Sequence, residues 1–174
     1  MPAINSLRWF KPVNLNKYPH FNLTDARIWD SFLKVNPTLS LRFAYDVPLI
    51  DESQTPPSLD KNLSHDWNYL TAFKVDVIGE RAAGLDLYEV KPLLTLQAIG
   101  QVMSYIVLFN KFYNNLQATT LNIVCTHADP QLAYVCKFYH INLFEIITED
   151  CNIEIFKNSL TNTRPFGRKN PDCC

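Results

Sequence analysis

Glycine is scarce in this sequence, with four residues among 174. None of the four is spaced as GxGxxG or GxxxxGK, the patterns whose glycines let the backbone approach a phosphate group. The sequence therefore argues against chemistry driven by a bound nucleotide. A nucleophile elbow and a paired Cys/His context are missing as well, which argues against a serine or cysteine hydrolase.

Long apolar runs, paired cysteines and a strong net charge are also missing. No stretch approaches the roughly 18 apolar residues that a spanning helix needs, and the first residues lack the apolar centre of a signal peptide, so we expect no membrane contact and a cytoplasmic protein. The five cysteines form no CxxC pair, which favours reduced thiols over a zinc site or a disulfide framework. The net charge is −1, so nucleic-acid binding would have to come from local basic patches.

The composition is that of a globular domain. Hydrophobic residues make up 47%, aromatic residues 13% and charged residues 19% of the chain. We expect an irregular N-terminal arm over residues 1–23, where prolines lie among aromatics, a single domain over residues 24–156, and a polar, locally basic tail over residues 157–174.

The order of predicted elements indicates an α/β fold. Thr24 or Asp25 is expected to cap a helix that runs to Val35, and the paired prolines and small polar residues of 51–66 predict a long loop. Gly84 would allow a hairpin turn within 80–84. The other predicted elements are strands at 39–50, 67–79 and 85–91, a helix at 93–114, a strand at 119–126, a helix at 129–139 and a strand at 141–147. Because the last strand, helix and strand suggest a parallel crossover, layer logic predicts a single mixed β-sheet flanked by helices.

Three charged residues mark a candidate site on the strands at 67–79 and 85–91. Side chains alternate along a strand, so Glu89 and Lys91 share one face, and the hairpin would bring Asp76 to them. Two carboxylates can hold a hard divalent cation, and a neighbouring lysine can orient water and offset negative charge, a combination that suits phosphodiester hydrolysis. The alternative is an ordinary surface salt bridge, which fits poorly with carboxylates set inside the apolar stretches VDVI and LYEV.

The helix at 93–114 adds a polar strip. On a helical wheel Gln97, Gln101 and Ser104 fall within one narrow sector and can face the same site. The expected apolar stripe of this helix consists of Leu96, Ile99, Met103, Ile106 and Asn110.

These motifs together resemble the PD-(D/E)XK nuclease superfamily. The resemblance rests on Asp76, on Glu89-Val90-Lys91 and on Gln101 with Tyr105, and it covers roughly residues 24–147. The stretches RFAYDVPLI, KVDVIG, LYEVKP and AIGQVMSY look like small nuclease-like proteins of tailed bacteriophages and prophages. The resemblance implies a restriction-endonuclease-like core of helix, three mostly antiparallel strands, helix and strand (αβββαβ).

The resemblance also implies roles for residues. Asp76, Glu89 and the backbone carbonyl of Val90 would hold Mg²⁺, with Mn²⁺ as a substitute, while Lys91 and Gln101 would act on the attacking water. Val75 stands where the family pattern has proline. The first helix offers Asp25 and Asp30 where many active members carry glutamate.

Several further residues are candidates for supporting roles. Asp30 and Tyr105 would support the site, although Tyr105 is also read as a core residue and Gln101 as an exposed polar one. The candidate nucleic-acid contacts are Lys61, Arg164, Arg168 and Lys169.

Two functions remain open from the sequence. The first is a metal-dependent nuclease that cuts DNA, encoded by a phage and acting in the host cytoplasm. The second is a virion assembly protein, a neck or head-completion component that keeps the nuclease fold with little or no catalysis. Its partners would be phage structural proteins or further copies of the chain.

Overall fold

A six-stranded mixed sheet forms the centre of the protein, in a computed structural model that describes residues 7–113 and 118–146. The strands follow one another in chain order, β1 to β6, with antiparallel pairing as far as β4 and parallel pairing from β4 to β6. The predicted α/β class with one mixed sheet is confirmed. The strands are β1 (Trp9–Phe10), β2 (Arg42–Leu49), β3 (Phe73–Arg81), β4 (Gly84–Val90), β5 (Ala118–Cys125) and β6 (Ile141–Glu145).

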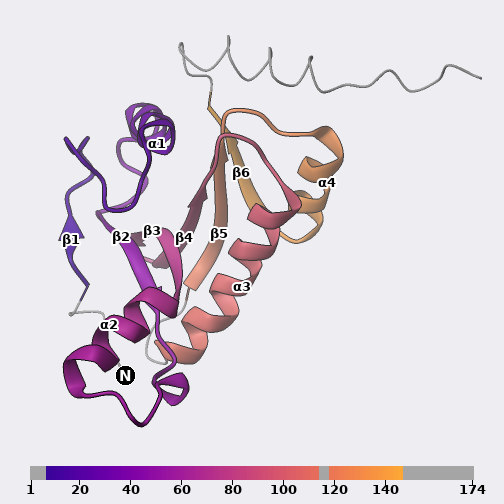
Figure 1. Ribbon diagram of the computed structural model, residues 1–174. Helices are drawn as coiled ribbons and strands as arrows, with labels where there is room; N and C mark the ends of the chain where they lie inside the picture. The colour runs from indigo at the N-terminus through magenta and orange to yellow at the C-terminus, as the bar shows by residue number, and fades with distance from the viewer. Residues whose placement is uncertain (1–6, 114–117, 147–174) are drawn as a thin grey trace, which may run out of the picture.

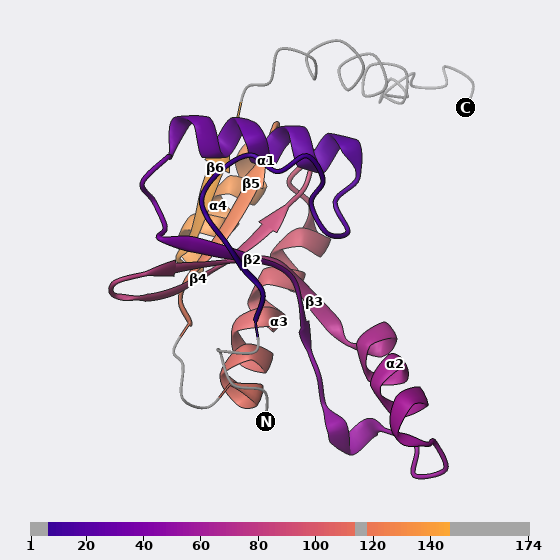
Figure 2. The same ribbon diagram turned by 90° about the vertical axis from the view of Figure 1, so that its left-hand side faces the viewer.

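Helices cover both faces of this sheet (Figure 1). In Figure 2, α1 crosses in front of the sheet while α3 and α4 lie behind it. The helices are α1 (Leu23–Val35), α2 (Lys61–Thr71), α3 (Leu96–Phe112) and α4 (Pro130–Phe138), with a short 3₁₀ turn at Glu52–Gln54. Among the described residues, no helix has the length and apolar character needed to cross a membrane.

The alternation of β4 divides the core into two layers. Leu85 and Leu87 belong to the cluster under α3, whereas Tyr88 and Val90 belong to the cluster under α1. This is the two-faced pattern predicted for this strand. Trp29 of α1 is fully buried and its ring lies edge-on to Tyr88, so the α1 layer is held largely by aromatic packing.

Side-chain caps set the helix boundaries. Asn22, not the predicted Thr24 or Asp25, caps α1 by accepting from Asp25 N–H at 2.9 Å. Asp129 caps α4, and Pro130 occupies the first turn where no donor is needed, as predicted. Gly84 has a φ of 143°, a conformation open to glycine, and it begins β4 directly after the turn from β3.

The segment between β2 and β3 differs from the prediction. The loop predicted over 51–66 contains the 3₁₀ turn and the start of α2, and Trp67, predicted to begin a strand, lies within that helix. The Asp60 side chain accepts from two backbone N–H groups and so caps α2. This cap stabilises a helix where the polar composition indicated a loop. In addition, β1 lies within the arm predicted to be irregular, where Trp9 pairs with Ala44 of β2.

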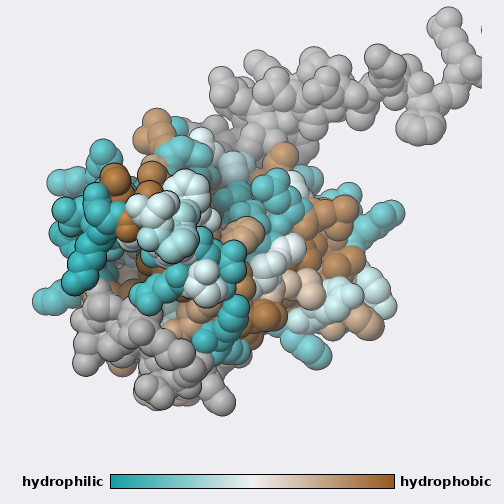
Figure 3. Space-filling view, turned by 60° about the horizontal axis from the view of Figure 1, so that its bottom comes forward, coloured by the Kyte–Doolittle hydropathy of each residue, from teal (hydrophilic) through white to brown (hydrophobic). Residues whose placement is uncertain are grey.

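Helix α2 projects from the body with its apolar residues outward. Leu63, Trp67 and Leu70 are exposed, no α2 residue is buried, and Figures 1 and 2 show the helix beyond the end of the sheet. The space-filling view that brings this end forward shows hydrophobic residues at the surface among hydrophilic ones (Figure 3).

The apolar stripe predicted for α3 is partly wrong, because Leu96 is 71% exposed and Ala98, Val102 and Phe109 face the sheet.

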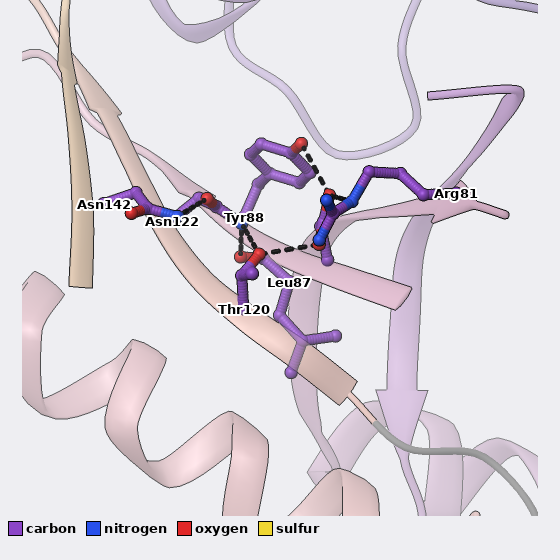
Figure 4. Close-up of polar contacts among 7 residues, drawn as sticks. Arg81, Leu87, Tyr88, Thr120, Asn122 and Asn142 are labelled. Atoms are coloured by element: carbon purple, nitrogen blue, oxygen red, sulfur yellow. Dashed lines mark hydrogen bonds and ion pairs between the residues drawn. The ribbon is translucent and has the colours of Figure 1, made fainter. Parts of the chain in front are cut away.

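A buried polar network ties four strands together near the β3–β4 turn (Figure 4). Asp86 accepts from Arg81 Nη2 and from Thr120 Oγ1, both at 2.6 Å. Asn122 donates to the Leu87 carbonyl at 3.1 Å and accepts from Asn142 Nδ2 at 2.9 Å. Each of these four bonds joins two neighbouring strands, so the network fixes the register of this end of the sheet.

Gly79 allows a close approach that an alanine would prevent. A Cβ at this position would lie 2.5 Å from Ser40 Oγ and 3.0 Å from Phe43 Cε1. We expect Gly79→Ala to lower the free energy of unfolding by about 1–3 kcal/mol, the usual cost of overpacking. Gly100→Ala is the matched control, because its Cβ would meet nothing within 4 Å and would raise helix propensity, adding about 0.5–1 kcal/mol. Urea denaturation of both variants measures these changes, and equal stability of the two would contradict the prediction.

Candidate active site

The candidate site lies where β3 and β4 separate. Their antiparallel register runs from Arg81↔Gly84 to Val77↔Tyr88 and ends there, two residues before the end of β4. Val90 N–H donates to the Asp76 side chain at 2.9 Å instead of to a β3 carbonyl. Because N–H and C=O of one strand residue point to the same side, the Val90 carbonyl faces the β3 side as well. The sheet thus opens into a fork lined by backbone and carboxylate oxygens.

The structure brings together the three charged residues predicted for the site. Lys91 Nζ lies 2.7 Å from Glu89 Oε1 and 3.5 Å from Asp76 Oδ2, so the ammonium bridges the two carboxylates. The Glu89 side chain is completely buried, whereas Asp76 is 24% and Lys91 34% exposed. Glu89 therefore forms the buried side of this group, and Asp76 and Lys91 form its solvent-exposed side.

Helix α3 supplies a second row of contacts. Tyr105 is buried and donates to Glu89 Oε2 at 2.9 Å, and Gln101 Nε2 lies 3.5 Å from the Tyr105 hydroxyl. Within the described part of the chain, the buried Gln101 Oε1 has no hydrogen-bond partner. Gln97 and Ser104, predicted to share the strip, are exposed, and Ser104 donates to the Gly100 carbonyl of its own helix. Only Gln101 of that strip is placed beside the charged group.

Of the two acids on the first helix, the structure places Asp25 near this group. Burial raises the pKa of Asp25, while the charge of Lys91 lowers it and that of Asp76 raises it, so the three groups interact electrostatically. Asp25 Oδ1 is buried without a hydrogen-bond partner among the described residues. Asp30, the acid predicted to support the site, instead accepts from Tyr18 OH at 2.5 Å. Five positions separate the two acids, which turns them well apart around a helix, and only the tertiary placement of α1 distinguishes them.

Burial dominates the electrostatics of the site. Desolvation, reinforced by the charge of Asp76, raises the pKa of Glu89 from 4.5 to about 7 despite the Lys91 ion pair. Desolvation also raises the pKa of Asp76. Burial alone would lower the pKa of Lys91, but the charges of Asp76 and Glu89 raise it. The raised pKa favours the cationic form of the lysine, but this single positive charge does not offset the desolvation of the two carboxylates.

Of the residues predicted to contact nucleic acid, the structure describes Lys61 alone. Lys61 is exposed at the start of α2, and Arg164, Arg168 and Lys169 fall outside the described residues.

The oxygen donors of the fork suit one hard divalent cation. Asp76, Glu89 and the Val90 carbonyl are the oxygen ligands that Mg²⁺ prefers, and Mg²⁺ commonly uses one or two carboxylates while keeping several waters. Asp25 interacts electrostatically with Asp76 and Lys91, and Gln101 lies against Tyr105, and each of these two residues has a buried oxygen without a hydrogen-bond partner among the described residues. Across residues 7–113 and 118–146, no three Asp, Glu, His or Cys side chains form a ready-made metal cluster, so a bound ion would rely on this smaller set and on water.

Comparisons with known proteins give little beyond this geometry. No family model matches the chain, and no curated protein matches it. Among solved structures, a repair endonuclease from Pyrococcus abyssi matches with 16% identity and a TM-score of 0.36. The match covers 42% of this chain and 32% of that one, so it concerns a part of the fold and does not extend to function.

The raised pKa of Glu89 predicts how stability depends on pH. Between pH 4.5 and 7 the folded, metal-free protein holds this proton more firmly than the unfolded chain does. The stabilisation is complete below the lower value and is lost as pH rises through the upper one, with a slope of at most about 1.4 kcal/mol per pH unit for one proton. We expect Glu89→Gln to flatten the fall in the free energy of unfolding over this range. Urea denaturation with a chelator present measures it, and parallel curves for the two proteins would contradict the prediction.

Proposed function

We propose that the protein is a metal-dependent nuclease that hydrolyses phosphodiester bonds in DNA. The observation that carries the proposal is the Lys91 ammonium set between the carboxylates of Asp76 and the buried Glu89, at the point where β3 and β4 part. Apart from α2, which lies between β2 and β3, the order of helix, three antiparallel strands, helix and parallel strand around this group is the one implied by the resemblance to the PD-(D/E)XK superfamily.

The cost of burying these charges favours a functional role. A buried ion pair is often no more stable than well-packed apolar residues of the same size, so stability alone gives little reason to retain it. Here the Glu89 carboxylate is completely buried while its pKa is raised, which means that its single lysine partner does not compensate the loss of water. A cation with two charges would supply what is missing.

Mg²⁺ bound by Asp76, Glu89 and the Val90 carbonyl would polarise the phosphate and lower the pKa of a water molecule. The charges of Asp76 and Glu89 raise the pKa of Lys91 in the metal-free fork, so we assign to its ammonium the roles of holding the attacking water and offsetting negative charge on the phosphate. Tyr105 orients the Glu89 carboxylate from the α3 side. Gln101 Oε1 and Asp25 Oδ1 are placed to accept hydrogen bonds from water.

A second candidate function, a virion assembly component, has one observation in its favour. Helix α2 presents Leu63, Trp67 and Leu70 to solvent, and such an apolar helix face is typical of a surface that meets another protein. Detection of the polypeptide in purified phage particles by mass spectrometry would support this function. Absence of the polypeptide from the particles would contradict this function. The two functions are compatible, since one protein can have both.

Removing the lysine tests the nuclease proposal directly. We expect Lys91→Ala to lower the rate of DNA cleavage in Mg²⁺ or Mn²⁺ by about 10²–10³, the usual cost of losing one group that stabilises transition-state charge. Linear and branched DNA, resolved on gels over time, supply the measurement.

Lys137→Ala is the matched control, because it removes an exposed lysine of α4. It should cleave as the unaltered protein does. Cleavage that is equal in all three proteins, or that persists in a chelator, would show that the activity does not arise from the fork.

A further inference from the structure

A second cluster of charged and polar side chains lies next to the fork, on the side of α2. It consists of Asp46, His20, Tyr69 and Lys74, and we name it the Asp46 cluster. Tyr69 OH donates to Asp46 Oδ2, His20 Nε2 lies 3.0 Å from both of these oxygens, and Lys74 Nζ lies 3.9 Å from Asp46 Oδ2. Lys74 Nζ also lies 3.7 Å from the centre of the Tyr69 ring. The Asp46 side chain is only 8% exposed.

Asp46 stands directly across the sheet from Asp76. The register pairs Tyr45 with Val77 and Val47 with Val75, which leaves Asp46 and Asp76 opposite one another at the step between them. That step is missing from the ladder. Asp46 has a φ of 52°, in the left-handed region that a non-glycine residue adopts at a cost.

Both strands change direction at this step. On a regular strand, residues three apart face opposite sides. Yet Ala44 and Val47 pack into the same core layer under α3, and so do Val75 and Ile78. The alternation of faces is therefore broken at Asp46 in β2 and at Asp76 in β3, and the paired breaks form a bend.

The bend and the fork occur at the same position of β3, because Asp76 lies in the bend with β2 and also beside the point where β3 and β4 separate. The pairing of β3 with β4 ends at Val77, immediately after Asp76 in space, and the Asp76 carboxylate then meets Val90 N–H. A straight β3 would continue the ladder and turn this carboxylate away from β4.

We propose that Asp46 is a positioning residue for Asp76: its left-handed backbone and its carboxylate, held by Tyr69 and His20, maintain the bend that aims Asp76 at the end of β4. The consequence for catalysis rests on the proposed nuclease function, but the structural effect does not. The anchors come from α2 and from the segment before α1, so the α2 insertion is tied to the geometry of the site.

The test follows the Val90 amide, whose hydrogen bond reports where Asp76 lies. In the full-length protein we expect Asp46→Ala and Tyr69→Phe to lower the hydrogen-exchange protection of this amide at least tenfold, measured by NMR relative to the global unfolding limit. Asp46→Asn tolerates the left-handed region and keeps an acceptor for Tyr69, so it should restore most of the protection.

Two variants serve as matched controls. His140 has a φ of 55° in the turn before β6, so His140→Ala imposes the same backbone cost far from the fork. Tyr134→Phe removes a hydroxyl from an exposed tyrosine of α4. Both should leave Val90 protected. Equal loss of protection in the Asp46 and His140 variants, or an Asn variant that behaves as Ala does, would overturn the proposal, and Tyr69→Phe decides it if Asp46→Ala does not fold.

Binding of Mn²⁺ alone, by calorimetry, separates this inference from the function. We expect Asp46→Ala to weaken Mn²⁺ binding at least tenfold and His140→Ala to leave it unchanged. If the unaltered protein binds no Mn²⁺, the proposed function is contradicted, and Val90 protection alone judges the role of Asp46.

Discussion

The desolvated Glu89 carboxylate is the constraint on which the centre of this protein depends. It lies completely inside the sheet–helix interface with one ammonium and one phenol as its partners. The neighbouring elements contribute to this environment: β4 carries Glu89, Lys91 follows directly after it, α3 carries Tyr105, and β3 carries Asp76. The interior of the fold thus holds a carboxyl group whose loss of water a single ammonium does not offset, while Asp76 and Lys91 beside it are partly exposed.

Buried polar groups near the β3–β4 turn and at the fork differ in whether they have hydrogen-bond partners. Near the β3–β4 turn, both oxygens of the buried Asp86 carboxylate have partners, from the Arg81 guanidinium and the Thr120 hydroxyl. At the fork, oxygens of Asp25 and Gln101 are buried without partners among the described residues. A satisfied network specifies strand register, whereas a buried acceptor without a partner is a position where water can bind.

The sequence predicted the sheet and the fork residues because both depend on local periodicity. Period-two alternation assigned Glu89 and Lys91 to one face of the strand predicted at 85–91, and a hairpin through Gly84 brought Asp76 to them. It failed where tertiary placement decides. Helix α2 was missed because its apolar residues face outward, Asp30 was chosen over Asp25 because nothing local shows how α1 is rotated, and the bend at Asp46 has no signature beyond a residue type that tolerates a left-handed backbone.

The order of strands in the sheet has a consequence for how the protein forms. Because a tight turn joins β3 to β4, these two strands can pair through a short connection, whereas residues 50–72 separate β2 from β3 and β5 must wait for the crossover through α3. The stretch from Asp76 to Tyr105 is continuous in the chain and contains the fork acids, the lysine and their α3 partners. The centre of the site is thus contiguous in the chain, while α2 precedes it and contacts Asp46 of β2 through Tyr69.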